Sequence, residues 1–358
     1  MEDRELTAPR VSAYADVSTR LALLSDSRLG DALATSSELG SGVGGRSAQL
    51  QVEGVPVFVK RIPLTDREMR PENLRSTANL FDLPLFYQYG IGSAGFGAWR
   101  ELAAHVMTTG WVLENACTDF PLMYHWRILP DQPPTGFMDL FGGLEATVAH
   151  WEGSPAVRRR LEEIGASSFS LFLFLEYVPR TLSIWLDEKR EERAAGAAIE
   201  SPYPWVEKSL KRGIEFMRSR GLSHFDAHFR NVLTDGRQLY FTDFGLAVSN
   251  RFALSAEESA FLTLHAGYDR GYTVSHLLRH HALKEVCDDD GREAFLQDWI
   301  AGRRPEVPPE IGALLDRYAR CAVALEAFHR RLLRKSKTTP YPALEIQQAL
   351  NSVCGPLS

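Results

Sequence analysis

The residues best suited to chemistry lie in one stretch, residues 221–247. Asp226 is followed five positions later by Asn231, and Asp243 comes after two short apolar runs that flank an Asp-Gly pair. Such a pair favours a tight turn, so residues 232–241 are predicted to form a β-hairpin with Asn231 and Asp243 at the same end. Amide and carboxylate oxygens suit Mg²⁺, and a further carboxylate can take a proton from a hydroxyl. Phosphoryl transfer needs this set of groups.

The same stretch resembles the protein-kinase superfamily, with H-x-D-x-x-x-x-N at residues 224–231 and D-F-G at residues 243–245. The resemblance implies that Asp226 is the catalytic base and that Asn231 and Asp243 bind Mg²⁺. His224 would then be structural. His228 stands where kinases often have a lysine that touches the γ-phosphate, and either that contact or a packing role in the loop fits a histidine.

A glycine-rich hairpin is predicted near the start of the chain. Gly40, Gly42 and Gly45 fit G-x-G-x-x-G, and three strands are expected over residues 34–63. Strands on both sides of the glycines favour a hairpin over phosphates, as in kinases, rather than a dinucleotide site. A merely flexible hairpin is the alternative. Ser47 replaces the valine that kinases favour there, so the adenine contact is expected to be weaker.

Lys60 ends an apolar strand, where an ammonium needs an anionic partner. Val-Phe-Val-Lys resembles the kinase V-A-I-K strand, whose lysine holds the α- and β-phosphates. Its carboxylate partner is expected to be Glu101, near the start of a predicted helix at residues 99–107, with Glu68 as the alternative. Arg61, the next residue, should point to the opposite face of the strand.

Residues 169–178 form a continuous apolar run that is typical of a buried strand. Its end, Leu-Glu-Tyr-Val, resembles the segment that joins the two kinase lobes. The resemblance implies that the Glu176 carbonyl and the Val178 amide bind adenine, with Leu175 beside them.

The predicted fold class is α+β, a bilobal protein-kinase-like fold with a small antiparallel sheet and one helix in the N-lobe and a larger, mainly helical C-lobe. Residues 1–32 are a leader with one short helix at 18–24 and no candidate site residue. Residues 33–178 are the N-lobe, with strands at 111–113 and 121–129 and insertions at about 70–97 and 130–166. Residues 179–358 are the C-lobe with a helical C-terminal extension. Its expected helices cover residues 204–218, 272–283, 292–301, 309–333 and 341–353.

Two departures from protein kinases bear on the phosphate acceptor. Phe225 stands where many kinases have an arginine that receives a phosphorylated loop. No A-P-E follows Gly245; a capping box at Ser255–Glu258 instead opens a helix after a short segment. This is similar to aminoglycoside and choline kinases, which lack the platform that docks a peptide.

Composition excludes several classes of protein. A net charge of −6 with pI near 6.0 disfavours nucleic acid as the main partner. The four cysteines form no C-x-x-C pair, which argues against a zinc site or a disulfide framework and indicates reduced thiols. The charged N-terminus argues against a signal peptide, and the lack of a long apolar run argues against a membrane-spanning helix. A cytoplasmic location is expected.

The expected function is Mg²⁺- and ATP-dependent transfer of the γ-phosphate to a Ser/Thr hydroxyl of a protein or peptide. Lys60, Glu101 and Asp226 are the expected catalytic residues. A small-molecule hydroxyl kinase of the aminoglycoside or choline type is one alternative. A non-catalytic ATP-binding scaffold is the other, although such proteins have usually lost one of these residues.

Overall fold

The computed structural model describes residues 2–42 and 45–351. The fold class is α+β, as predicted, with a five-stranded antiparallel sheet in the first half and a mainly helical later half. The chain divides into two compact units, residues 1–178 with 242–259 and residues 179–241 with 260–358. No helix in the described part of the chain is long and apolar enough to cross a membrane.

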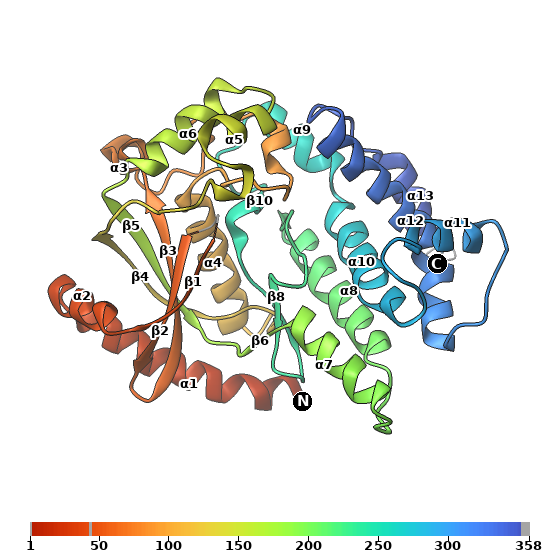
Figure 1. Ribbon diagram of the computed structural model, residues 1–358. Coiled ribbons are helices and arrows are strands. Elements are labelled where there is room, and N and C mark those ends of the chain that lie inside the picture. Colours follow the sequence, from red (N-terminus) through yellow and green to blue (C-terminus); the bar gives the residue numbers. More distant parts are fainter. Residues whose placement is uncertain (1, 43–44, 352–358) are drawn as a thin grey trace. The chain divides into compact units, whose positions relative to one another are not determined.

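The sheet of the first unit has the strand order β1-β2-β3-β5-β4 (Figure 1). Its strands are β1 (Ser37–Gly42), β2 (Gly45–Val52), β3 (Val55–Leu64), β4 (Met123–Pro130) and β5 (Phe169–Glu176). The three strands predicted over residues 34–63 are therefore present. Glu53 and Gly54 both have positive φ, which gives the tight turn between β2 and β3 its right-handed twist.

One face of the sheet packs on helix α4 (Ala98–Leu113). Because side chains alternate along a strand, Lys60, Ile62 and Leu64 of β3 share this face. Ile62 and Leu64 join a core cluster with the buried leucines of β5 and with Trp99 and Leu102 of α4. This core sets the distance between α4 and the end of β3 that carries Lys60.

Two N-terminal helices, α1 (Glu2–Leu23) and α2 (Asp26–Ala34), pack against strands of the same sheet. The prediction of a single short helix at 18–24 was therefore wrong. Pro9 lies inside α1 and the apolar residues of this segment are few, so its helical pattern in the sequence is weak. Val17 and Leu21 of α1 are fully buried. The helix is therefore stabilised by tertiary packing rather than by a regular amphipathic pattern.

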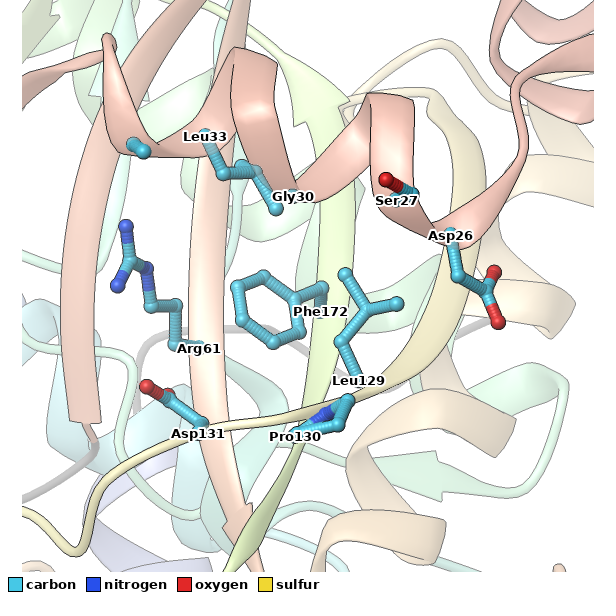
Figure 2. Close-up of a pocket in the computed structure, with 10 residues that line it drawn as sticks. Asp26, Ser27, Gly30, Leu33, Arg61, Leu129, Pro130, Asp131 and Phe172 are labelled. Atoms are coloured by element: carbon cyan, nitrogen blue, oxygen red, sulfur yellow. The ribbon is translucent and has the colours of Figure 1, made fainter.

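Arg61 lies on the opposite side of β3 from Lys60, as predicted. It lines a pocket of about 470 Å³ between α2 and the sheet, beside its cross-strand partner Phe172 (Figure 2). The guanidinium lies 5.4 Å from the centre of the Phe172 ring. The pocket therefore belongs to the α2 side of the sheet and not to the face that carries Lys60.

The two predicted insertions pack together. The first follows α3 (Asp66–Met69) and contains η1 (Pro71–Asn73) and η2 (Leu85–Gln88), and the second contains η3 (Asp139–Phe141), α5 (Leu144–His150) and α6 (Pro155–Gly165). Their apolar residues form one cluster of their own, which includes Tyr87, Phe96, Trp151 and Leu161. The aromatic and glycine-rich segment at 86–97 is accordingly a packed loop.

The strand predicted at residues 111–113 was wrong, since these residues are the last turn of α4. Trp111 and Val112 are buried together with Ala104 and Thr108, at helical spacing. β-branched and aromatic residues suggested a strand, but the amphipathic face of a long helix outweighed that local preference.

The second unit contains a small sheet of β6 (Arg180–Thr181), β8 (Val232–Thr234) and β9 (Leu239–Phe241). The predicted hairpin is confirmed, with Val232 paired to Phe241 and Thr234 paired to Leu239. The helices of this unit are α7 (Leu182–Ala194), α8 (Tyr203–Ser219), α10 (Tyr268–His280), η5 (Ala282–Glu285), α11 (Arg292–Ile300), α12 (Pro309–Arg334) and α13 (Ala343–Asn351). The remaining short elements are β7 (Leu222–Ser223) of this unit, η4 (Phe244–Leu246) and β10 (Val248–Ser249) of the first unit, and α9 (Ala256–Leu264), which has residues in both.

Candidate functional site

Three of the predicted site residues meet within the first unit. Lys60 Nζ lies 2.6 Å from Glu101 Oε1 and 2.8 Å from Asp243 Oδ1. Lys60 and Glu101 are buried, whereas the Asp243 side chain is 41% exposed. The ammonium thus bridges an enclosed carboxylate and an accessible one.

Glu68, the alternative partner of Lys60, is fully buried elsewhere and has a different role. Its carboxylate accepts hydrogen bonds from the backbone N–H and hydroxyl of Thr65, from Ala98 N at 2.8 Å and from Arg160 Nη1 at 2.9 Å. The bond to Ala98 N satisfies a backbone donor in the first turn of α4. Glu68 therefore fixes the start of α4, and Glu101, in that same turn, is the residue that reaches Lys60.

The charges around Lys60 shift its pKa and that of Glu101. Burial by itself lowers the pKa of the Lys60 ammonium, but the carboxylates of Asp243 and Glu101 outweigh this effect, and the net pKa is raised. Burial raises the pKa of Glu101 to about 7, Lys60 opposes this shift, and Asp243 adds to it. Lys60 therefore remains charged at neutral pH.

Asp243 opens residues 243–245, the loop that is predicted to bind Mg²⁺ and is called the metal loop below, in a left-handed conformation with φ 60° and ψ 72°. A non-glycine residue in this region is uncommon, and such strain clusters at functional sites. The next side chain, Phe244, is buried against the edge of the His105 ring of α4, with 5.0 Å between ring centres. This packing ties the position of Asp243 to that of α4.

The first insertion also holds the metal loop, a contact that the motifs did not predict. Gln88 Nε2 donates a hydrogen bond to the carbonyl of Leu246, directly after the loop. A Cβ added to Gly95 would lie 2.5 Å from the carbonyl oxygen of Gly245. The unusual number of glycines in the insertion was the available signal, because only glycine permits such a close approach of two backbones.

The predicted adenine-binding residues lie at the end of β5. Glu176 N donates to Leu122 O at 2.7 Å, and the Glu176 carboxylate accepts hydrogen bonds from Arg10 and from Leu122 N. Val178 follows the strand and is partly exposed. Its N–H has no hydrogen-bond partner among the described residues, so it is available to a ligand.

The glycine-rich hairpin lies partly outside the described residues, since residues 43 and 44 of its turn are not among them. Gly42 pairs with Gly45 at the end of the two strands, and Gly40 has φ +150° beside an irregularity in the register. Ser47 Oγ donates to Gly40 O at 3.2 Å, so this hydroxyl binds within the hairpin.

In the second unit, the loop at residues 224–231, which is predicted to be catalytic, brings Asp226 and Asn231 together. Asn231 Nδ2 donates to the Asp226 backbone carbonyl at 3.0 Å and to Asp226 Oδ2 at 3.1 Å. Because Nδ2 makes both bonds, Oδ1 is the atom of Asn231 that would coordinate a cation. His228 is half-buried with Nε2 3.8 Å from Asp226 Oδ2, so it lies beside the predicted base.

Asp269 of α10 supports this loop, a role that no motif indicated. Its carboxylate accepts the backbone N–H of His224 at 2.7 Å and that of Phe225 at 2.8 Å. His224 is fully buried and its Nδ1 accepts from Asp226 N, which agrees with the structural role predicted for it. The available signal for Asp269 was a carboxylate within a helix whose neighbouring residues are mostly buried.

The two departures from the kinase pattern have structural counterparts. Phe225 is fully buried and stacks on Phe261 and Tyr268, so an aromatic cluster of the second unit occupies the position of the kinase arginine. The predicted capping box is confirmed in the first unit: Glu258 N donates to Ser255 Oγ, and Ser255 N donates to the Glu258 carboxylate.

The donor groups suit Mg²⁺ more than a transition metal. Asn231 of the second unit and Asp243 of the first unit each carry a hard oxygen of the kind that Mg²⁺ prefers, and each side chain is held by defined hydrogen bonds within its own unit. Among the described residues, no group of three or more His, Cys, Asp or Glu side chains is arranged to bind a metal ion by itself. Cys117, Cys287 and Cys321 are not in disulfide bonds among the described residues. No protein-family model matches this sequence, and a search of curated proteins found no match either.

Proposed function

We propose that this chain is a phosphotransferase with a bilobal protein-kinase-like fold, which moves the γ-phosphate of Mg·ATP to a hydroxyl group. The contact of Lys60 with both Glu101 and Asp243 supports this function most strongly. The Asp243 carboxylate is partly exposed and lies on a strained turn, and such strain is typical of functional sites. A charged lysine held in this way is a suitable group to bind nucleotide phosphates.

The proposal gives each site residue one role. Lys60 holds the α- and β-phosphates, and Glu101 keeps its ammonium in place. Asp226 orients the acceptor hydroxyl and takes its proton, while Asn231 and Asp243 hold Mg²⁺. The bound cation would neutralise negative charge on the phosphate oxygens. Most of the rate enhancement would come from positioning and from charge stabilisation in a preorganised site.

The remaining predicted residues bind the nucleotide. The glycine hairpin with Gly40, Gly42 and Gly45 would cover the phosphates, and His228 would donate to the γ-phosphate when protonated. The Glu176 carbonyl and the Val178 amide bind adenine. The unpartnered N–H of Val178 supports this assignment, because a backbone donor gains most from a ligand when the protein supplies no partner.

A Ser/Thr hydroxyl of a protein or peptide is the first candidate for the acceptor, on the Leu-Glu-Tyr-Val and Asp-Phe-Gly-Leu-Ala segments that resemble Ser/Thr protein kinases. A small hydroxylated molecule is the second candidate. Two observations favour it: Ser255 already caps α9 shortly after the metal loop, and Phe225 is buried where a phosphate-binding arginine would stand. A cytoplasmic location, where ATP is abundant, is part of the proposal.

The test is transfer of label from γ-labelled ATP, in the presence and absence of Mg²⁺, to lysate proteins and separately to a set of hydroxylated metabolites. Label on Ser or Thr would support the first acceptor, and label on metabolites alone would support the second. Asp226→Asn and Asp243→Asn should abolish either transfer. A wild-type chain that binds ATP tightly but transfers no phosphate would be the non-catalytic scaffold, and a chain that binds no ATP would overturn the proposal.

A further inference from the structure

Arg10, in the first half of α1, makes a fork-shaped contact with the end of β5. Its Nε donates to Glu176 Oε1 at 2.8 Å, and its Nη2 donates to Glu176 Oε2 at 2.7 Å. The same guanidinium donates to the backbone carbonyls of Thr118 and Phe120. Both charged side chains are largely buried, with 11% and 14% of their surface exposed. Only arginine has enough donors in a rigid plane to make all of these bonds.

Glu176 is held from a second direction as well. Leu122 N donates to Glu176 Oε2 at 3.0 Å, and Glu176 N donates to Leu122 O at 2.7 Å. The side chain and backbone of Glu176 are thus fixed by α1 and by the segment at 118–122. The position of the chain at the end of β5 therefore depends on α1, not only on the pairing of β5 within the sheet.

Helix α1 is itself firmly attached, so it can serve as an anchor. Val17 and Leu21 are fully buried, and Tyr14 packs against Tyr124 of β4. At the C-terminal end of the helix, Arg127 of β4 donates to the carbonyls of Leu21 and Leu24. A helix that is held by these contacts along its second half can serve as a support for Glu176.

We propose that Arg10 is a positioning residue for recognition of the nucleotide base. The inference rests on the proposed function, because it assigns the base to the backbone at Glu176 and Val178. Val178 lies two residues beyond the clamped carboxylate. Holding Glu176 fixes the direction in which the Glu176 carbonyl and the Val178 N–H present their hydrogen bonds to adenine. Lys60 binds the phosphates through a separate set of contacts that do not include Arg10.

The experiment compares two probes, Mg·ATP and Mg·tripolyphosphate, by calorimetric titration. Arg10→Ala should weaken Mg·ATP binding about fivefold or more and leave tripolyphosphate binding unchanged, because only ATP carries a base. The variant should also discriminate less between ATP and GTP. Arg20→Ala is the matched control, since Arg20 lies on the same helix and pairs with Glu53 at the surface. It should bind both probes like the wild type.

Two further variants keep the outcome clear. Arg10→Lys retains the charge but cannot make both hydrogen bonds to Glu176, so it should show the same loss of ATP affinity with unchanged tripolyphosphate affinity. It replaces Arg10→Ala in the experiment if that variant does not fold. The double variant Arg10→Ala/Glu176→Gln should bind Mg·ATP no more weakly than the weaker-binding of the two single variants. The two substitutions remove the same contact, so their effects should not add. Equal loss of both probes would indicate general damage and overturn the inference, as would unchanged ATP binding. The inference would also be overturned if the wild-type chain bound Mg·ATP no more tightly than Mg·tripolyphosphate. A wild-type chain that binds neither probe would overturn the proposed function itself.

Discussion

Asp269 accepts a hydrogen bond of 2.8 Å from the backbone N–H of Phe225, a residue in the left-handed conformation with φ 63°. A second bond from His224 N reaches the other carboxylate oxygen. The two bonds stabilise a strained backbone directly before Asp226. The predicted base is therefore positioned by a buried carboxylate 43 residues later in the chain.

The first prediction concerns the pH dependence that Asp269 gives to stability. Burial raises the pKa of Asp269 to about 6 from an ordinary value of 3.8, although its two backbone hydrogen bonds oppose the shift. The folded protein therefore binds the Asp269 proton more tightly than the unfolded chain does. This contribution to the free energy of unfolding is fully present below about pH 3.8 and is lost as the pH rises through about 6. Asp269→Asn cannot titrate, so the free energy of unfolding of wild type relative to this variant should grow by up to about 3 kcal/mol between about pH 7 and pH 4.

Urea unfolding of both proteins at several pH values measures this difference. Asparagine has one acceptor oxygen, so one of the two backbone bonds is lost and the variant should also be less stable at neutral pH by about 1–3 kcal/mol. A difference between the two proteins that does not vary with pH would contradict the titration of Asp269.

The second prediction compares neighbouring cations on β3. Lys60→Met removes the ammonium between Glu101 and Asp243, and phosphate transfer should fall at least about 100-fold. Arg61→Met makes a similar change one residue along but on the opposite face, beside Phe172, and should leave turnover near that of the wild type. Initial rates with saturating Mg·ATP test both variants. Substantial turnover by Lys60→Met would show that this lysine does not act on phosphate.

The third prediction concerns the contact between the first insertion and the metal loop. Gly95→Ala places a Cβ 2.5 Å from the Gly245 carbonyl oxygen and must displace the loop. Gly153→Ala is the matched control, because Gly153 has a similar φ of +68° but nothing within 4 Å of the added Cβ. Both variants should lose about 1–2 kcal/mol through backbone strain.

Only Gly95→Ala should also lose activity beyond its loss of stability. Thermal unfolding and ATP turnover, measured on the same preparations, separate the two effects. If both variants keep full turnover, the insertion does not hold the metal loop in its active position.

The fourth prediction contrasts two ion pairs of α6. Arg160 is buried against Glu68 at 2.9 Å, so Arg160→Ala leaves an unpaired buried carboxylate and should cost about 3–5 kcal/mol. Arg158 pairs with Glu145 at the surface, where solvent screens the charges, and Arg158→Ala should change stability little. Chemical denaturation gives both values, and a similar effect of the two substitutions would contradict the difference in burial.

Local patterns in the sequence determined many of the elements and the candidate residues. The hairpin at 232–241 followed from an Asp-Gly turn between apolar runs, and the capping box from Ser255 and Glu258 three residues apart. Strand β5 followed from a continuous apolar run, and Arg61 from the alternation of side chains along β3. These features depend on neighbours within a few positions, which the sequence displays directly.

Only the tertiary structure decided which distant groups meet. The sequence favoured Glu101 as the partner of Lys60 and left Glu68 as an alternative, and only the packing shows that Glu68 instead caps α4 and pairs with Arg160. Helix α1 has little amphipathic pattern, and it folds because β4 and Arg127 provide its contacts. Asp269 has no motif, since its partners are backbone N–H groups that any residue supplies. Long-range contacts follow from how complete elements pack, and that packing is not encoded in the spacing of any single segment.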